Sequence, residues 1–181
     1  MNTIIETERL IIREMGQNDI NEMLALHSDP EVHRYLGNKT ITSRKKMEQI
    51  INSLVQQYDD YGVGRWAMIH KQTKAFIGWT GLEFVTKTVN QHQNFYDLGY
   101  RLVKTYWGQG FATESAIASI QYGFDQLNLP TINAMADKEN GASNYILKKI
   151  GLQFVKNFEF EGVPHHWYQL EKAEYHQSEV F

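Results

Sequence analysis

The sequence predicts one α/β domain, of the α+β kind, in which helices flank a single mostly antiparallel sheet. The chain has 181 residues, which is the usual size of one domain. Segments with strand periodicity and segments with helix periodicity follow one another in the order β-α-α-β-β-β-α-β-α-β-β. No internal repeat, low-complexity tract or linker interrupts this order. Residues 1–181 are therefore expected to form a single domain.

The first part of the chain is expected to supply one strand, two helices and then three strands. A short β-type run at 9–13 is followed by Asn18-Asp19, which is expected to cap an amphipathic helix. A second helix opens at Thr42 or Ser43 and keeps apolar residues at helical spacing until Gly62 ends it. The strands that follow read as an antiparallel meander and lie at 65–69, 76–84 and 95–103.

The second part of the chain begins with a loop that contains Gly108 and Gly110. The loop leads into a helical pattern that Asn128-Leu129-Pro130 closes, and a strand is expected at 131–136. A further helix over 140–150 precedes two final strands, at 153–160 and 166–170. The sheet should thus have about seven strands, and a strand-helix-strand crossover at its centre makes it a mixed sheet.

Composition and charge restrict the classes of partner. Lys and Arg number 18 against 21 Asp and Glu, a net charge of −3, so no basic excess is available for a nucleic acid or an anionic membrane. No segment reaches the roughly 18 apolar residues of a membrane span, and the start of the chain has no signal-peptide core. Cysteine is absent, which excludes disulfides, Cys-ligated zinc and a thiol nucleophile. We therefore expect a cytoplasmic protein with no nucleic-acid and no membrane partner.

The segment from Leu98 to Glu114 is the most informative one, because a strand passes through a glycine loop into a helix. Gly108 and Gly110 allow backbone N–H groups to form a concave nest, to which the positive end of the helix dipole adds. Such a loop suits an anion, usually phosphate. By itself the pattern is equally typical of a tight connection between a strand and a helix. It lacks the lysine of a Walker loop and the third glycine of a dinucleotide fingerprint.

Four segments follow one another in a set order, together with Gly99-Tyr100: Thr7-Glu8-Arg9-Leu10-Ile11-Ile12-Arg13, Tyr106-Trp107-Gly108-Gln109-Gly110-Phe111-Ala112-Thr113-Glu114, Asn140-Gly141-Ala142-Ser143 and Lys149-Ile150-Gly151-Leu152. In this combination they resemble the GNAT superfamily, and the opening segment is similar to its RimJ/RimL-type branch of ribosomal-protein-alanine N-acetyltransferases. The resemblance covers a core of about 7–172. It implies the GNAT fold, with a sheet splayed at its central strands to hold acetyl-CoA. It also implies direct acetyl transfer from acetyl-CoA to a primary amine in a ternary complex.

The resemblance implies which residues hold acetyl-CoA. Backbone groups near Leu102 and Val103 would pair with the pantetheine arm, and Asn140 corresponds to a residue close to it. The backbone N–H groups of the glycine loop and the helix start would hold the pyrophosphate. In this chain those positions are Gly108, Gln109, Gly110, Phe111, Ala112 and Thr113. The Gln or Arg that the family commonly has three residues before the first glycine is Thr105 here, which predicts a weaker phosphate contact.

Ser143 is the residue that we expect to protonate the departing thiolate. Attack of an amine on a thioester requires loss of a proton from the amine and stabilisation of the thiolate. The resemblance places Ser143 near the thioester sulfur, and its spacing of three puts it on the same helix face as Asn140. Asn140 also has the residue type of a simple helix N-cap. Many GNAT proteins have a Tyr where this chain has Leu147, and Tyr145 lies about 200° around the helix from that position.

Asp97 and Glu83 are the candidates for the general base, since they are the carboxylates closest to the strands that should line the cleft. A water held by such a carboxylate would be sufficient. Strand alternation places Asp97, Gly99 and Arg101 on one face and Tyr100 on the other. Asp97 could equally be a solvated edge charge paired with Arg101.

The last predicted hairpin carries the run His165-His166-Trp167-Tyr168. Adjacent histidines on a strand point to opposite faces and cannot easily chelate one ion, so no metal site is expected. The two histidines are candidates for lining the acceptor pocket. The alternative is an exposed hairpin with a packed Trp167.

The acceptor itself remains open between a protein N-terminus and a small-molecule amine. An acidic pocket would suit a cationic small molecule, and its carboxylates would be Glu83, Asp97, Glu159 and Glu161. A non-catalytic acyl-CoA-binding or regulatory module is the alternative to an enzyme, and the Leu at position 147 supports it. A homodimer is one possible assembly.

Overall fold

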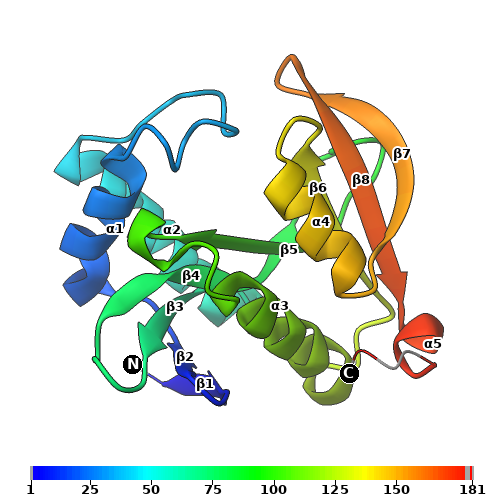
Figure 1. Ribbon diagram of the computed structural model, residues 1–181, viewed down its shortest axis with the longest axis horizontal. Helices are drawn as coiled ribbons and strands as arrows, with labels where there is room; N and C mark the ends of the chain where they lie inside the picture. Colours follow the sequence, from blue (N-terminus) through cyan, green and yellow to red (C-terminus); the bar gives the residue numbers. More distant parts are fainter. Residues whose placement is uncertain (1, 178–179, 181) are drawn as a thin grey trace.

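The computed structural model describes residues 2–177 and 180, which form one domain around a single mixed sheet of eight strands (Figure 1). The strands are β1 (Thr3–Glu6), β2 (Leu10–Arg13), β3 (Arg65–His70), β4 (Phe76–Val85), β5 (Phe95–Leu102), β6 (Thr131–Asp137), β7 (Gln153–Phe160) and β8 (Val163–Glu171). They lie in the order β1-β2-β3-β4-β5-β6-β8-β7, and every neighbouring pair is antiparallel except β5 with β6. The predicted fold class is confirmed.

Helices cover both faces of this sheet. They are α1 (Ile20–Ser28), α2 (Arg44–Tyr61), α3 (Phe111–Gln121), α4 (Gly141–Lys149) and the short α5 (Lys172–Tyr175). Trp66 packs with α3 and α4 in the larger apolar cluster, whereas the next residue, Ala67, packs with α1 and α2 in the smaller one. Side chains alternate along a strand, so β3 contributes to both cores. Among residues 2–177 and 180, no helix combines the length and the apolar character that a membrane crossing requires.

The ends of the helices follow local rules, with one exception. Ser43 caps α2 by accepting a hydrogen bond from the Lys46 N–H, and Gly62 ends the helix in the left-handed conformation, as predicted. Asp19 precedes α1, but its side chain does not cap that helix. Its carboxylate accepts hydrogen bonds from the Arg13 guanidinium and from the Gly16 N–H instead. The ion pair with Arg13 therefore replaces the predicted cap.

The fold extends beyond the expected core of 7–172 at both ends. Strand β1 pairs with β2 and is an eighth strand. Its four residues are too short a run to predict a strand from the sequence. At the other end Tyr175 is buried against Phe124, with ring centroids 4.8 Å apart, and its hydroxyl donates to Asp125. Phe124 and Asp125 belong to a π-helical turn that prolongs α3.

The sheet opens between β5 and β6. Strand β5 pairs with β4 at eight positions but with β6 at a single one, Asp97 with Asn133. Beyond Asp97 the two parallel strands diverge. One arm of the molecule then contains β1 to β5 with α1 and α2, and the other contains β6, β7, β8 and α4 (Figure 1). This is the splay that the sequence resemblance implied.

Candidate functional site

The glycine loop after β5 presents a row of unused backbone donors. Gly108 and Gly110 have φ values of 71° and 84°, a region that favours glycine. Gly110 is the N-cap of α3 and provides no side-chain cap. In the part of the chain that the structure describes, the N–H groups from Gln109 to Thr113 donate no hydrogen bond. An α-helix leaves its first N–H groups free in this way, and together with the helix dipole they attract an anion.

Thr7 and Arg9, near the start of the chain, and Glu114 of α3 form a hydrogen-bonded brace that holds this loop. The Glu114 carboxylate accepts hydrogen bonds from the Thr7 hydroxyl at 2.6 Å and from Arg9 Nε at 2.7 Å. Arg9 Nη1 also donates to the Gln109 carbonyl at 2.9 Å, and the guanidinium lies 4.2 Å from the Phe111 ring centroid. Burial raises the pKa of Glu114, but the hydrogen bonds from Thr7 and Arg9 outweigh it and leave that pKa lowered. The resemblance included Thr7 and Arg9 without indicating this contact.

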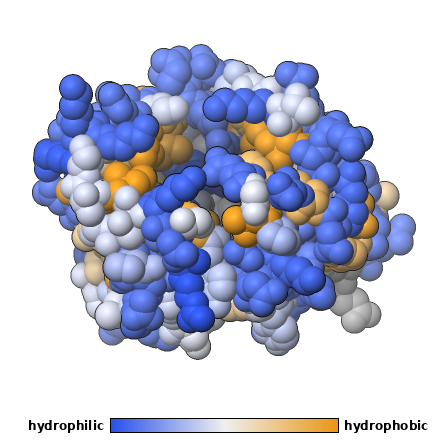
Figure 2. All heavy atoms as spheres, turned by 90° about the horizontal axis from the view of Figure 1, so that it is seen from above, coloured by the Kyte–Doolittle hydropathy of each residue, from blue (hydrophilic) through white to orange (hydrophobic). Residues whose placement is uncertain are grey.

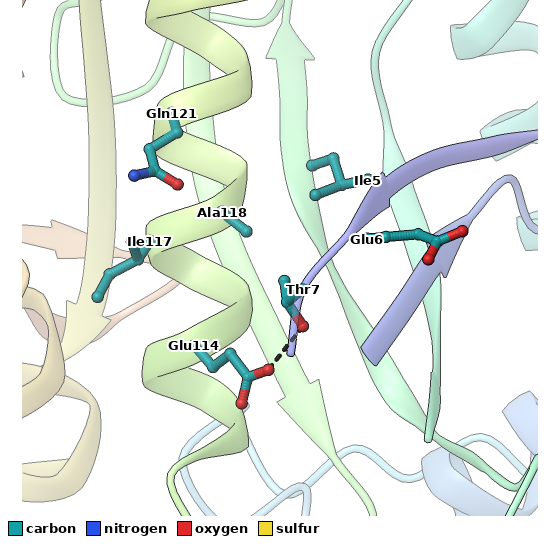
Figure 3. Close-up of a pocket in the computed structure, with 7 residues that line it drawn as sticks. All are labelled: Ile5, Glu6, Thr7, Glu114, Ile117, Ala118 and Gln121. Atoms are coloured by element: carbon teal, nitrogen blue, oxygen red, sulfur yellow. Dashed lines mark hydrogen bonds between the residues drawn. The ribbon is translucent and has the colours of Figure 1, made fainter. Parts of the chain in front are cut away.

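Figure 3 shows Thr7 and Glu114 joined across a shallow cavity between the start of the chain and α3. The cavity is lined by Ile5, Glu6, Thr7, Glu114, Ile117, Ala118 and Gln121. Two brace residues, Thr7 and Glu114, line this cavity, but none of its lining residues belongs to the glycine loop. We therefore treat it as a surface depression behind the loop and not as part of the opening between β5 and β6.

The open edge of β5 offers few free backbone groups. The Val103 N–H donates to the Ile77 carbonyl of β4, and the Val103 carbonyl accepts from the Tyr106 N–H. The indole N–H of Trp107 donates to the Leu102 carbonyl at 2.9 Å. Because backbone groups alternate along a strand, Tyr100 and Leu102 direct theirs toward the open side. Within residues 2–177 and 180, the Leu102 N–H and both backbone groups of Tyr100 therefore remain for a ligand, whereas Val103 is fully paired.

Ser143 meets β5 on the face that carries α3 and α4. The side chain of Asn140 accepts a hydrogen bond from the Ser143 N–H, so Asn140 is the N-cap of α4. The Tyr100 hydroxyl lies 3.2 Å from Ser143 Oγ and donates to the Ser143 carbonyl at 3.3 Å. Burial raises the pKa of Tyr100 to about 12, so the phenol keeps its proton. Leu147 is buried in the core, while Tyr145 is exposed on the opposite side of the helix.

The two candidate base residues lie on the other face of the sheet and share one partner. Asp97 and Glu83 are directly opposite each other on β5 and β4. Arg65 Nη2 forms ion pairs with both, with Glu83 at 3.3 Å, and Arg65 also donates to the carbonyls of Gly81 and Asp97. Burial raises the pKa of Asp97 to about 6 although Arg65 opposes that shift. Asp97 is thus a buried ion-paired carboxylate, and Arg101 is not its partner.

The side chain of Glu83 is 40% exposed and that of Asp97 is 7% exposed. Asp97 Oδ1 is buried without a hydrogen-bond partner within the described residues. Of the two carboxylates, Glu83 is therefore the one that solvent and an acceptor can contact directly. Sequence reasoning missed Arg65, which is the first residue of β3 and 32 positions away from Asp97.

His165 and His166 point to opposite faces of β8, as their adjacency predicted. His166 Nδ1 lies 2.9 Å from Asn144 Oδ1 on the α4 side, and burial together with Lys148 lowers its pKa. His165 packs beside Phe158 and Phe160 on the other face. No group of three His, Cys, Asp or Glu side chains is placed to hold a metal ion in the part of the chain that the structure describes.

The structure thus brings the candidate residues together around the open edge of β5. Ser143 and Tyr100 lie on one side of this edge, Asp97 and Glu83 lie on the other, and the free N–H groups of the glycine loop lie at its end. Viewed from above, the surface is hollowed between the two arms, and hydrophobic side chains gather on both sides of the hollow (Figure 2). A long ligand with an anionic group could lie in this opening.

Comparison with known proteins agrees with this geometry. The family model of the acetyltransferase (GNAT) domain matches residues 9–153. The N-acetyltransferase YoaA of Bacillus subtilis is 32% identical over 153 residues, which are 84% of each chain. Two solved structures share the fold. An acetyltransferase of the GNAT family from Bacillus anthracis has a TM-score of 0.77 at 22% identity and covers 93% of this chain and 98% of its own.

The second solved structure is a spermidine N-acetyltransferase from Vibrio cholerae in complex with CoA and spermine. It has a TM-score of 0.76 at 17% identity and covers 93% of this chain and 99% of its own. At such identities the two structures show the fold alone. The family model covers most of the chain, and the relative from B. subtilis exceeds 30% identity. The chain therefore belongs to the GNAT family of acetyltransferases.

Proposed function

We propose that the protein transfers an acetyl group from acetyl-CoA directly to a primary amine, and that it belongs to the RimJ/RimL-like branch of the family. One observation carries this proposal. The sheet opens after the single β5–β6 pair, and the opening ends at five unused N–H groups, from Gln109 to Thr113. These donors fit the pyrophosphate of acetyl-CoA, because neither side chains nor neighbouring backbone occupy them.

The remaining contacts with acetyl-CoA follow from the free groups along the opening. The N–H of Leu102 and the backbone groups of Tyr100 are the proposed partners of the pantetheine arm. The side-chain amide N–H₂ of Asn140 is a further candidate, since only its oxygen is used in the helix cap. The side of Gly108 where a Cβ would project is open space, with no protein atom within 4 Å, so a ligand can approach the backbone there.

The proposed proton donor and proton acceptors lie on opposite faces of β5. The amine nitrogen forms the new bond to the acetyl carbon, and the bond from that carbon to sulfur breaks. Glu83 and Asp97 are the proposed acceptors of the proton that the amine loses, with a water between them and the amine. Ser143 is the proposed donor to the departing thiolate, and the Tyr100 hydroxyl positions it. Direct transfer requires no acyl-enzyme, and an acyl-cysteine intermediate is excluded because the chain contains no cysteine.

Purified protein should release free thiol from acetyl-CoA only when a suitable amine is present. The measurement is thiol release across a panel of N-terminal peptides, amino acids and polyamines. Because Asp97 has a pKa raised to about 6, kcat/KM should fall with decreasing pH near that value. The Asp97→Asn variant should lose this limb of the profile if Asp97 is the base, and the Glu83→Gln variant should retain it.

Two results would contradict the proposal. If coenzyme A raised the melting temperature but no amine released thiol, the chain would be a non-catalytic acyl-CoA-binding module. If neither coenzyme A nor acetyl-CoA raised it, the assignment of Gly108 to Thr113 would be wrong.

A further inference from the structure

Arg101 is a half-buried cation on the α1–α2 face of β5. Its Nη1 donates to the His27 ring, 3.0 Å from Nδ1, and its Cζ lies 5.0 Å from the ring centroid of Trp79. Among residues 2–177 and 180, no carboxylate forms an ion pair with it. A guanidinium has five N–H donors, so most of its hydrogen-bonding capacity remains unused.

Among the described residues, no anionic side chain pairs with Arg101 to neutralise its charge. The carboxylates on the same face of β4 and β5, Asp97 and Glu83, are both held by Arg65. Burial and the Arg101 charge lower the pKa of His27 to about 3, so this ring is neutral and acts as an acceptor. His33 lies 5.3 Å from His27, centroid to centroid, and its pKa is also lowered by burial and by Arg101. Removing an unpaired charge from water is costly, and an anionic ligand would offset that cost.

Arg101 is close enough to the candidate base to contact the same small molecule. The Cζ atoms of Arg65 and Arg101 lie 5.3 and 5.0 Å from the same Trp79 ring centroid, so they are at most about 10 Å apart. Arg65 in turn holds Asp97 and Glu83. A small molecule about 10 Å long or shorter could therefore place its amine at these carboxylates and an anionic group at Arg101.

We propose that Arg101 binds a carboxylate of the acceptor, so that the acceptor is a small primary amine that also carries a carboxylate. This inference rests on the proposed function and adds the substrate class. The guanidinium fork matches a carboxylate bidentately. A polyamine, such as the spermine bound to the V. cholerae spermidine N-acetyltransferase, would instead bring positive charge toward Arg101.

Matched acceptors of equal length test the proposal. The panel contains an amino acid with a terminal amine and a carboxylate, its carboxamide, and the corresponding diamine, each assayed by thiol release. We expect kcat/KM for the carboxylate to exceed that for the carboxamide at least about tenfold, since a hydrogen bond to a charged group contributes that much. The diamine should be poorer still. Arg101→Gln should lower kcat/KM for the carboxylate more than for the carboxamide, mainly through KM, and so abolish the preference, and Arg101→Lys should retain part of it.

Arg34→Gln is the matched control, because it removes the same charge at an exposed position of the α1–α2 loop. Unchanged coenzyme A affinity and melting temperature would show that Arg101→Gln is folded. Equal rates for carboxylate and carboxamide in the wild type, or an equal loss for all acceptors in Arg101→Gln, would overturn the carboxylate site. Thiol release with any amine would still uphold acetyl transfer, so the two proposals fail separately.

Discussion

Arg65 organises the charges on the α1–α2 face of the sheet. It binds the carboxylates of Asp97 and Glu83 and two backbone carbonyls, and its guanidinium lies flat against β5. Gly99 permits this arrangement, because a Cβ at that position would lie 2.7 Å from the guanidinium carbon. A side chain at position 99 would therefore displace Arg65 and leave Asp97 buried without its counter-ion.

At the residue scale, Ser143→Ala should lower kcat by about 100-fold, the lower range for a general acid. Tyr100→Phe should have a smaller effect, about fivefold, because it removes one hydrogen bond that positions Ser143. Steady-state thiol release measures both variants. The KM for acetyl-CoA should change little in either case. A Ser143→Ala enzyme with the wild-type kcat would show that another group or water protonates the thiolate.

The glycine loop depends on an element far from it in the sequence. Arg9 follows β1 and immediately precedes β2, yet it contacts the loop carbonyl of Gln109 and the α3 residue Glu114. Because the Gln109 carbonyl is held by Arg9, the loop peptide keeps its orientation before any ligand arrives. The brace thus lowers the conformational entropy that binding would otherwise cost.

At the element scale, Arg9→Ala should weaken coenzyme A binding about tenfold while kcat at saturating acetyl-CoA remains near the wild-type value. The physical reason is the loss of loop ordering, and titration calorimetry measures the dissociation constant. Arg44→Ala is the matched control, since it breaks an exposed ion pair with Glu48 on α2. If both variants bound coenzyme A as the wild type does, the brace would have no role in binding.

Within the described residues, folding buries two histidines, His27 and His33, and disfavours their protonation. His27 and His33 are 7% and 4% exposed, and burial is the main cause of their lowered pKa values. In the unfolded chain a histidine takes up a proton near its ordinary pKa of about 6.5. The folded protein resists that proton until the pH approaches the lowered value, about 3 for His27.

At the scale of the molecule, the free energy of unfolding should therefore decrease as the pH falls below about 6.5, because only the unfolded state gains the proton. His27→Gln should reduce this decrease, because it removes the ring that takes up the proton in the unfolded state. The Gln side-chain oxygen can still accept a hydrogen bond from Arg101 and so preserve the folded structure. Melting temperatures between pH 7 and pH 5 test it. His176→Gln, at an exposed position, serves as the control. Parallel curves for wild type and His27→Gln would contradict the linkage.

The order of elements and several boundaries could be predicted because their causes are local. Ser43, Gly62 and the strand 153–160 behave as their residue types and periodicity indicate. Strand β1 could not be predicted in this way, because its four residues become a strand only through pairing with β2. The cap expected at Asp19 was wrong because the Arg13 ion pair competes for its carboxylate.

The family pattern and the position of the glycine loop could be predicted from short runs of consecutive residues. That loop depends on Gly108, Gly110 and the helix start beside them, so its cause lies within a few consecutive residues. The contacts between distant side chains became apparent only from the three-dimensional structure. Arg65 with Asp97 and Tyr100 with Ser143 are separated by 32 and 43 positions. These pairings arise from sheet register and helix packing, as does the unpaired charge of Arg101, and no local pattern encodes them.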